Sequence, residues 1–155
     1  MRGSSPLIHC ITNYVTAGDT ANMLLAAGAS PIMADDPSES AEITALAQGL
    51  TLNLGTPSGS RVEAMLRSGA EANRRGIPVV FDPVGAGCSG FRRNSAGEIL
   101  RRVRLTAIRG NLSEISYLAG FESRENGVDS SETRITAAED AQTSGEKRRT
   151  PGTNS

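Results

Sequence analysis

Short apolar segments alternate with helix-like segments along residues 7–120 of the chain. Each apolar segment has the length of a single strand and is almost continuously apolar, which is typical of strands buried on both faces of a sheet. The segments between them carry helix-capping residues, and the connections are short. This alternation predicts a doubly wound α/β fold with a mainly parallel sheet and flanking helices. The five expected strands span residues 7–11, 30–34, 50–54, 78–82 and 105–109.

Capping and stop residues predict the bounds of five helices that follow these strands. Glycines stand where several of the helices are expected to end. The expected helices are 20–27 with Asp19 as cap and Gly28 as stop, a helix opened by Asp36, Pro37 and Glu39, a helix from the capping box at 60–63 to Gly76, one over 95–103, and a short one from the capping box at 111–114 to Gly120.

Polarity changes sharply near residue 121. A chain of 155 residues has the size of one domain. Residues 122–155 are rich in charged residues, Ser, Thr and Gly and hold few apolar ones. Such a segment buries too little apolar surface to offset the entropy of ordering it. We therefore expect a folded part over residues 1–121 and a polar, poorly ordered tail over residues 122–155.

Composition excludes several classes of function. A net charge of −1 does not suit a nucleic-acid-binding surface. No apolar run reaches the roughly 20 residues of a membrane span, and the first residues lack a signal-peptide pattern. Cys10 and Cys88 lack metal-ligand spacing and are expected to be reduced, buried thiols. We therefore expect a soluble, cytoplasmic protein.

Polar side chains follow the expected strands at their carboxyl ends, where ligands bind in open α/β sheets. They comprise a cation, carboxylates, amides and glycines that let a ligand approach the backbone. Arginine neutralises phosphate oxygens, and carboxylates hold Mg²⁺ directly or through water. The set therefore favours a site for a phosphate and a metal ion. Its members are Thr12 and Asn13, Met33 to Asp35, Asn53 with Gly55 and Thr56, Asp82 with Gly85 to Gly87, and Arg109 with Asn111 and Glu114.

Structural explanations stand beside the functional ones for several of these residues. Asp82, which precedes Pro83, is equally consistent with the end of a strand before a turn. On spacing alone, Glu114 is more readily a capping residue than a metal ligand, and Met33 is more readily a core residue than a ligand contact. Arg109 is harder to explain structurally, because a buried arginine needs a partner.

Two further features carry weaker functional signals. His9, the single histidine, lies in an apolar strand and is expected to be a hydrogen-bonded core residue rather than a catalytic base. Residues 85–90 match G-x-G-x-x-G, and Glu114 follows about 20 residues later, as in a dinucleotide-binding fingerprint. That fingerprint belongs in the first strand–helix turn, whereas this loop follows the fourth expected strand. Dinucleotide binding is therefore a weaker hypothesis than a site for a phosphate and a metal ion.

Five segments of the chain occur together: PLIHCITN at 6–13, GASPIMA at 28–34, NLGT at 53–56, DPVGAG at 82–87 and IRGNLSE at 108–114. They resemble hydroxyethylthiazole kinase, a family of the ribokinase-like superfamily that serves thiamine salvage. Together they cover residues 6–121 in the family's order and spacing. The resemblance implies a ribokinase-like fold. It also implies transfer of the ATP γ-phosphate to the hydroxyl of 4-methyl-5-(2-hydroxyethyl)thiazole, with Mg²⁺ as cofactor.

The same resemblance implies a role for five residues. Met33 would contact the thiazole, and Asn13 would help to position it. Arg109 would bind the phosphates of ATP. Asp82 and Glu114 would organise Mg²⁺ and phosphate, the latter within the superfamily's N-x-x-E pattern. These groups supply positioning and charge neutralisation, which are most of what phosphoryl transfer requires.

The resemblance also implies parts that have no counterpart here. Family members are considerably longer, and their second half supplies a glycine-rich anion hole beside the residue that activates the hydroxyl. No catalytic residue is therefore assigned, and we expect a truncated copy with little or no kinase activity. The alternative hypothesis is a non-catalytic thiazole-binding module. Family members form homotrimers whose sites are shared between subunits, and the oligomeric state of this chain is left open.

Overall fold

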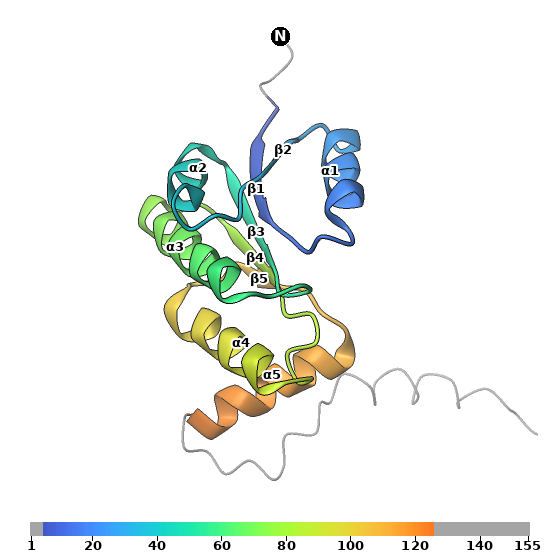
Figure 1. Ribbon diagram of the computed structural model, residues 1–155, viewed down its shortest axis with the longest axis vertical. Coiled ribbons are helices and arrows are strands. Elements are labelled where there is room, and N and C mark those ends of the chain that lie inside the picture. Colours follow the sequence, from blue (N-terminus) through green and yellow to red (C-terminus); the bar gives the residue numbers. More distant parts are fainter. Residues whose placement is uncertain (1–4, 126–155) are drawn as a thin grey trace, which may run out of the picture. The chain divides into compact units, whose positions relative to one another are not determined.

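A five-stranded parallel sheet organises the protein (Figure 1). The computed structural model describes residues 5–125, with side chains as far as Gly120. Neighbouring strands follow the order β2-β1-β3-β4-β5, and every pair is parallel. The expected parallel α/β fold is confirmed. The strands are β1 (Leu7–Ile11), β2 (Ser30–Met33), β3 (Gly49–Asn53), β4 (Val79–Asp82) and β5 (Ala107–Ile108).

The register aligns the carboxyl ends of the central strands. Ile11 lies beside Leu52, and Asn53 lies beside Asp82. The chain reverses its direction of travel across the sheet between β1 and β3, because β2 lies on one side of β1 and β3 to β5 lie on the other. In open α/β sheets, ligands bind at the carboxyl edge next to such a reversal. The residues that end β1, β3 and β4 therefore lie where a ligand is expected.

Five helices follow the strands, and they cover the two faces of the sheet unequally. Figure 1 shows α1 on one side of β1 and β2, and α2, α3 and α4 on the other side. Helix α3 packs against both α2 and α4. The helices are α1 (Ala17–Ala26), α2 (Ser40–Leu46), α3 (Gly59–Arg75), α4 (Gly90–Arg102) and α5 (Leu112–Glu125).

Two of the expected helix starts were wrong. One aspartate expected as a cap lies inside its helix, and the other closes a turn before its helix. Asp19 lies in the first turn of α1, whose cap position is Thr16. Asp36 accepts hydrogen bonds from Ser38 N at 2.8 Å and from Ser38 Oγ at 2.6 Å. Because the Asp36 side chain closes this turn, it does not cap the helix, and α2 begins only at Ser40.

Serines cap helices α3 and α4 before the starts that were expected for them. Ser58 and Ser89 cap α3 and α4, so both helices begin earlier than the sequence pattern suggested. The end of α3 was predicted correctly, because Gly76 adopts φ 71° there. Helix α5 begins at the expected box but continues past Gly120 to Glu125. From residue 126 onward, the expected tail lies outside the described residues. The expected boundary after residue 121 stays a prediction.

The core lies between the sheet and the layer of α2, α3 and α4. Its largest fully buried side chains come from alternating positions of β3 and β4 and from the facing helices. By contrast, α1 (Ala17–Ala26) contributes no buried residue. The side chains of this core include Leu50, Leu52, Val79, Phe81, Met65 and Ile99.

Single residues complete the comparison with the expectations. Cys10 is buried as expected, but Cys88 is exposed, because it lies in the loop before α4 rather than in a strand. Among residues 5–125, no helix is both long and apolar enough to cross a bilayer.

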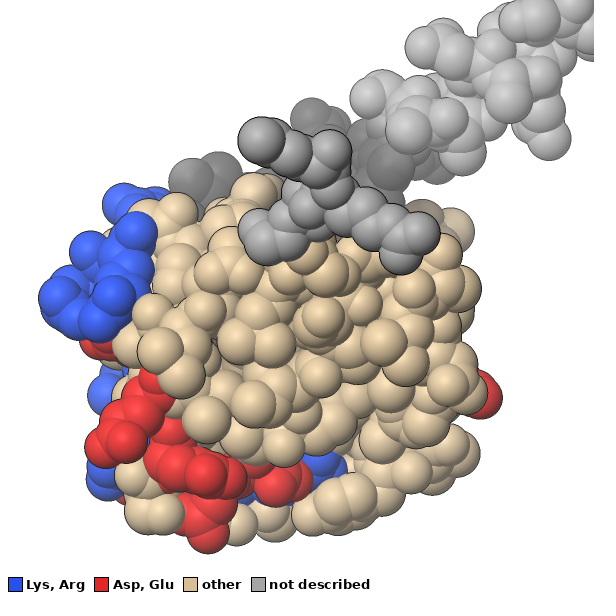
Figure 2. Space-filling model, turned by 90° about the horizontal axis from the view of Figure 1, so that it is seen from above, with Lys and Arg blue, Asp and Glu red and all other residues tan. Residues whose placement is uncertain are grey.

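Figure 2 views the molecule from above Figure 1. Most of that face carries uncharged side chains, and most of the acidic and basic ones lie along one side.

Candidate functional site

Asp82 ends β4 and lies between an amide and a guanidinium. Its Oδ2 accepts a hydrogen bond from Asn53 Nδ2 at 3.2 Å and from Arg109 Nη1 at 2.8 Å. The Asp82 side chain is 15% exposed, whereas that of Arg109 is 82% exposed. The expected partner of Arg109 is thus present, but the expectation that Arg109 is buried was wrong. It lies just past β5 at the sheet edge, where its free face can meet an anion.

Opposing influences act on the Asp82 carboxyl. Burial raises its pKa most, the positive charge of Arg109 lowers it, and the negative charge of Glu114 raises it again. Two carboxylates in a partly buried site favour a cation between them, because a cation removes both the repulsion and the cost of burial.

Glu114 acts as a cap and also reaches the neighbouring loop. Asn111 Oδ1 accepts from Glu114 N at 2.9 Å, and Glu114 Oε2 accepts from Asn111 N at 2.9 Å. This reciprocal pair is the capping box that the sequence predicted. The second carboxylate oxygen, Oε1, accepts from Gly85 N at 3.1 Å. Glu114 therefore ties the start of α5 to the loop after β4.

An open cleft of about 400 Å³ brings the residues expected for phosphate and metal together. Residues 5–125 hold no cluster of three or more His, Cys, Asp or Glu side chains that could ligate a metal. A pair of carboxylates still fits Mg²⁺, which keeps several waters and is bound through one or two carboxylates plus substrate phosphates. The cleft is lined by Asp82, Val84, Arg109, Gly110, Asn111 and Glu114.

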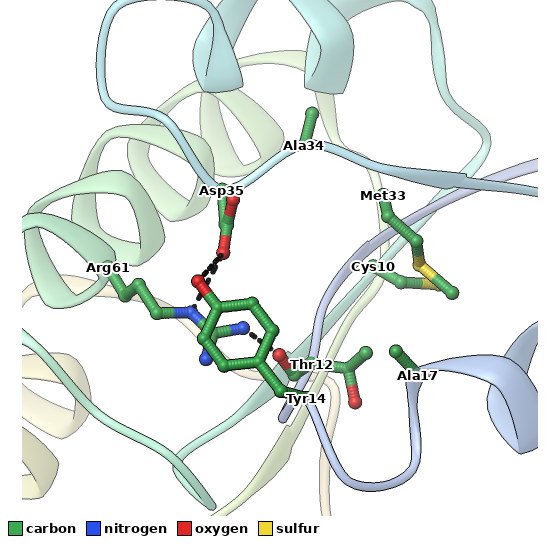
Figure 3. A pocket seen from close by; sticks show the side chains of 8 residues that line it. All are labelled: Cys10, Thr12, Tyr14, Ala17, Met33, Ala34, Asp35 and Arg61. Carbon is green, nitrogen blue, oxygen red and sulfur yellow. Dashed lines mark hydrogen bonds and ion pairs between the residues drawn. The ribbon is translucent and has the colours of Figure 1, made fainter.

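Met33 lines a second, smaller pocket of about 100 Å³ at the ends of β1 and β2 (Figure 3). Its side chain is 41% exposed, so the core-packing explanation is wrong for this residue. Asn13 lies next to this pocket in the chain but does not line it, because its amide is bonded to Thr16 and Asn53 instead. The pocket is lined by Cys10, Thr12, Tyr14, Ala17, Met33, Ala34, Asp35 and Arg61.

Arg61 is a buried cation at this pocket that the sequence analysis missed. The residue is 4% exposed, and its Nη1 donates to Thr56 O at 2.9 Å while Nη2 donates to Thr12 O. Its Nε forms an ion pair with Asp35 Oδ2 at 3.0 Å without hydrogen-bond alignment. The ring of Tyr14 lies over the guanidinium, 4.2 Å from its Cζ, as Figure 3 shows.

Arg92 plays a comparable part beside the cleft and was also missed. Its Nη1 donates to Leu54 O and Val84 O, both at 2.6 Å, and its Nη2 donates to Gly55 O at 2.7 Å. It therefore joins the loop after β3 to the loop after β4. A sequence signal for both arginines exists, since each stands in the pattern S-G-x-R at 58–61 and 89–92.

His9 takes no part in the site. It is fully buried, with Nδ1 2.8 Å from Thr44 Oγ1 and Nε2 2.7 Å from Ala34 O. Burial lowers the pKa of its imidazole, which favours the neutral ring. The expectation of a hydrogen-bonded core histidine is confirmed.

Comparison with known proteins decides the family of this chain. A model of the hydroxyethylthiazole kinase family matches residues 1–151. The chain belongs to this family. It is 53% identical to a hydroxyethylthiazole kinase from Ruminiclostridium cellulolyticum over 135 residues, which are 87% of this chain and 50% of that relative. It is 52% identical to one from Clostridium beijerinckii over 132 residues, 85% of this chain and 48% of the relative.

Two solved structures resemble the chain to different degrees. The hydroxyethylthiazole kinase protein from Pyrococcus horikoshii superposes with a TM-score of 0.74 at 43% identity, over 81% of this chain and 49% of that one. The receiver domain of a sensor histidine kinase from Pseudomonas aeruginosa superposes with a TM-score of 0.51 at 15% identity, over 77% of this chain and 96% of that one. At that identity, the likeness shows the fold alone.

The chain spans about half the length of the hydroxyethylthiazole kinases that it matches. Within that half, the structure brings Asp82, Arg109 and Glu114 into one cleft and places Met33 in a separate pocket. Asn13 joins the two regions through its bond to Asn53 rather than by lining either one.

Proposed function

We propose that the described residues form the strand-edge part of a hydroxyethylthiazole kinase site. There, the γ-phosphate of ATP would pass to the hydroxyl of hydroxyethylthiazole. The observation that carries the proposal is the row of polar contacts from Asn13 to Arg109, with the Met33 pocket at one end and the Glu114 cleft at the other. These are the two neighbouring subsites that a phosphoryl transfer between two small molecules needs.

The Met33 pocket suits the thiazole ring in its chemistry. Cys10, Met33 and Ala34 offer it apolar and sulfur-bearing surface. Tyr14 stacks on Arg61 at the opposite wall and presents the pocket with an aromatic ring. In this proposal Met33 contacts the thiazole, and Asn13 positions it indirectly by holding the loop that carries Tyr14.

The Glu114 cleft suits Mg²⁺ and the phosphates of ATP. Arg109 neutralises phosphate oxygens with the face of its guanidinium that Asp82 leaves free. Asp82 and Glu114 would hold Mg²⁺, which proteins usually bind through one or two carboxylates. When bound, Mg²⁺ neutralises the charge that develops on the transferring phosphoryl group. The residues of this chain orient the nucleotide and bring its phosphates to the end of β4.

Thermal unfolding with each ligand tests the two subsites separately. A ligand that binds only the folded chain raises its unfolding temperature. We expect hydroxyethylthiazole to stabilise the wild type but not Met33→Asp, and Mg²⁺ with ATP to stabilise the wild type but not Arg109→Leu. Arg102→Leu, which removes an exposed arginine at the end of α4, is the matched control and should keep both responses. A cooperatively unfolding wild type that responds to neither ligand would disprove the proposal.

Release of ADP that depends on hydroxyethylthiazole tests the transfer itself. ADP release above the level measured without hydroxyethylthiazole would support the proposed transfer, and its absence in a chain that binds both ligands would contradict it. The second candidate function, a thiazole-binding module, follows from the same pocket. Stabilisation by thiazole without any response to Mg²⁺ and ATP would favour that module over the kinase.

Association between copies of the chain is a further part of the proposal. Tyr14 and Val15, beside the Met33 pocket, and Met23 and Leu25 on α1 are all more than half exposed. Large apolar side chains left this exposed are available to an interaction surface. We propose a homotrimer that buries them, and sedimentation equilibrium of the purified chain measures it. A monomer at all concentrations would contradict this part.

The chain is proposed to act in the cytoplasm. Cys10 and Cys88 are both free thiols, as is usual in a reducing compartment. Fractionation of cells that express a tagged chain checks this location, and recovery in the membrane or external fraction would contradict it.

A further inference from the structure

A line of side-chain hydrogen bonds crosses the sheet from β1 to β4. Asn13 Nδ2 donates to Asn53 Oδ1 at 3.1 Å, and Asn53 Nδ2 donates to Asp82 Oδ2 at 3.2 Å. These residues follow or end three neighbouring strands, so the line spans two interstrand spacings, about 10 Å. Asn53 lines neither the Met33 pocket nor the Glu114 cleft. It lies between the proposed subsites without belonging to either.

Backbone donors fix the direction of both amides. Thr16 N donates to Asn13 Oδ1 at 2.9 Å, and Gly55 N donates to Asn53 Oδ1 at 2.8 Å. A backbone N–H can only donate, so each atom that receives it is the amide oxygen. Each amide nitrogen then points to the next residue in the line. All donors therefore point from β1 towards Asp82, whose carboxylate is the acceptor at the end.

Close packing holds the two amides against each other. A Cβ atom at Gly55 would lie 2.7 Å from Asn13 Cβ and 2.8 Å from Asn53 Oδ1. Only glycine lets the loop after β3 close over both side chains at this distance. Asn13 is buried, and Asn53 and Asp82 are half-buried. In such packing, a reoriented side chain displaces its neighbours rather than moving alone.

We propose that Asn53 is a positioning residue that couples the thiazole subsite to the nucleotide subsite. The inference rests on the proposed function, since both subsites are part of that proposal. The Asp82 carboxylate would be held in one place when it binds Mg²⁺ and phosphate, and a fixed acceptor orients the donor of Asn53. Asn53 Oδ1 is then oriented towards Asn13.

The far end of the line reaches the loop that shapes the thiazole pocket. Asn13 Oδ1 accepts from both the backbone N and the Oγ1 of Thr16, the latter at 3.0 Å. A fixed Asn13 therefore fixes the turn between them, which carries Tyr14. Nucleotide binding thus preorganises the thiazole pocket. By linkage, the thiazole strengthens nucleotide binding by the same factor.

Calorimetric titration measures this coupling directly. Hydroxyethylthiazole is titrated into the full chain with and without saturating Mg²⁺ and a non-hydrolysable ATP analogue. In the wild type we expect its Kd to fall by a factor within the usual range of about 5 to 150 when the nucleotide is present. Asn53→Asp keeps the acceptor for Asn13 and Gly55 N but loses the donor to Asp82. We expect the factor to become 1 in this variant.

Asn73→Asp is the matched control. Asn73 Nδ2 donates to Arg104 O at 2.8 Å, and its Oδ1 accepts from Arg104 N at 2.7 Å. The same substitution there also removes one amide donor, but at the end of α3 away from the strand-end site. We expect this control to keep the coupling factor of the wild type. A factor that is equal in the wild type and in Asn53→Asp would overturn the proposal, whatever happens to the affinity of each ligand alone.

A test without ligands separates this inference from the proposed function. In the wild-type background, Asp82→Ala should shift the side-chain amide NMR signals of Asn13, although the two residues are not in contact. In the Asn53→Leu background, the same substitution should leave those signals in place. The spectra also show whether each variant folds. If the wild type binds neither ligand, the proposed function fails, and these spectra alone decide whether Asn53 connects the two positions.

Discussion

Arg61 and Arg92 occupy the same place in successive helices, each as the third residue of a helix capped by a serine three positions earlier. Ser58 Oγ accepts from Arg61 N at 3.3 Å, and Ser89 Oγ accepts from Arg92 N at 3.2 Å. Both guanidiniums then bind carbonyl oxygens of strand-end loops. Together they tie the loops after β1, β3 and β4 into one edge.

Removal of the Arg92 side chain is expected to loosen this edge. Arg92→Met leaves the carbonyl oxygens of Leu54, Gly55 and Val84 without their cationic donor. We expect the free energy of unfolding to fall by about 2–3 kcal/mol, since hydrogen bonds to charged groups are the stronger ones. Urea unfolding measures the change. Arg93→Met removes the exposed neighbour and should cost about 0.5 kcal/mol or less; equal losses in the two variants would contradict the assignment.

Gly69 allows α3 and α4 to approach each other. A Cβ atom there would lie 2.7 Å from Cγ1 of Val103, the residue that caps the end of α4, and at that distance the side chain or the backbone around it must shift. We expect Gly69→Ala to lower the free energy of unfolding by about 1–3 kcal/mol through overpacking. The added substitution Val103→Ala should recover part of that loss relative to the sum of the two single changes.

Gly18 provides the opposite control for that experiment. It lies within α1, and a Cβ atom there meets nothing within 4 Å. Gly18→Ala should therefore stabilise the protein by about 0.5–1 kcal/mol, because alanine loses less backbone entropy in a helix. If both glycine substitutions changed stability by the same amount, close packing at Gly69 could not be the reason.

His9 is expected to make stability depend on pH. Burial lowers the pKa of His9 in the folded chain, while the unfolded chain keeps the ordinary value of about 6.5. The unfolded state then binds more protons below that pH. The free energy of unfolding should therefore be level above about pH 6.5 and fall as the pH decreases from there towards the lower folded-state pKa, below which it levels off.

Urea unfolding between pH 8 and pH 5 measures this dependence. His9→Leu should remove this decrease with pH, although it also lowers stability at pH 8 because Thr44 and the Ala34 carbonyl lose their partner. An undiminished pH dependence in the variant would assign the effect to another group.

Arg109 is expected to affect the pKa of Asp82 more than the free energy of unfolding. Its side chain is 82% exposed, so Arg109→Leu should cost about 1 kcal/mol or less of unfolding free energy. The pKa of Asp82 should rise further, because Arg109 supplies the charge and one of the hydrogen bonds that hold it down. NMR titration of the Asp82 carboxyl checks the direction. An unchanged pKa would show that the Arg109–Asp82 ion pair does not persist in solution.

The sequence alone determined the class of fold and the sheet edge at which the candidate site is proposed. Alternating apolar and capped segments require parallel strands with helical crossovers, and the carboxyl ends of parallel strands meet at one edge. Asp82, Arg109 and Glu114 could therefore be grouped without coordinates, and the box at 111–114 was readable because both of its partners lie within one turn.

Only the tertiary structure decided which side chains contact one another across that edge. In the sequence, nothing distinguishes Asn53 from the other residues at strand ends. The register places it beside Asp82, and the hydrogen bond from Gly55 N fixes the direction of its amide. Likewise, nothing local shows that the guanidiniums of Arg61 and Arg92 turn back to carbonyl oxygens far along the chain. Local patterns specify backbone conformation, whereas these contacts depend on how separate strands align.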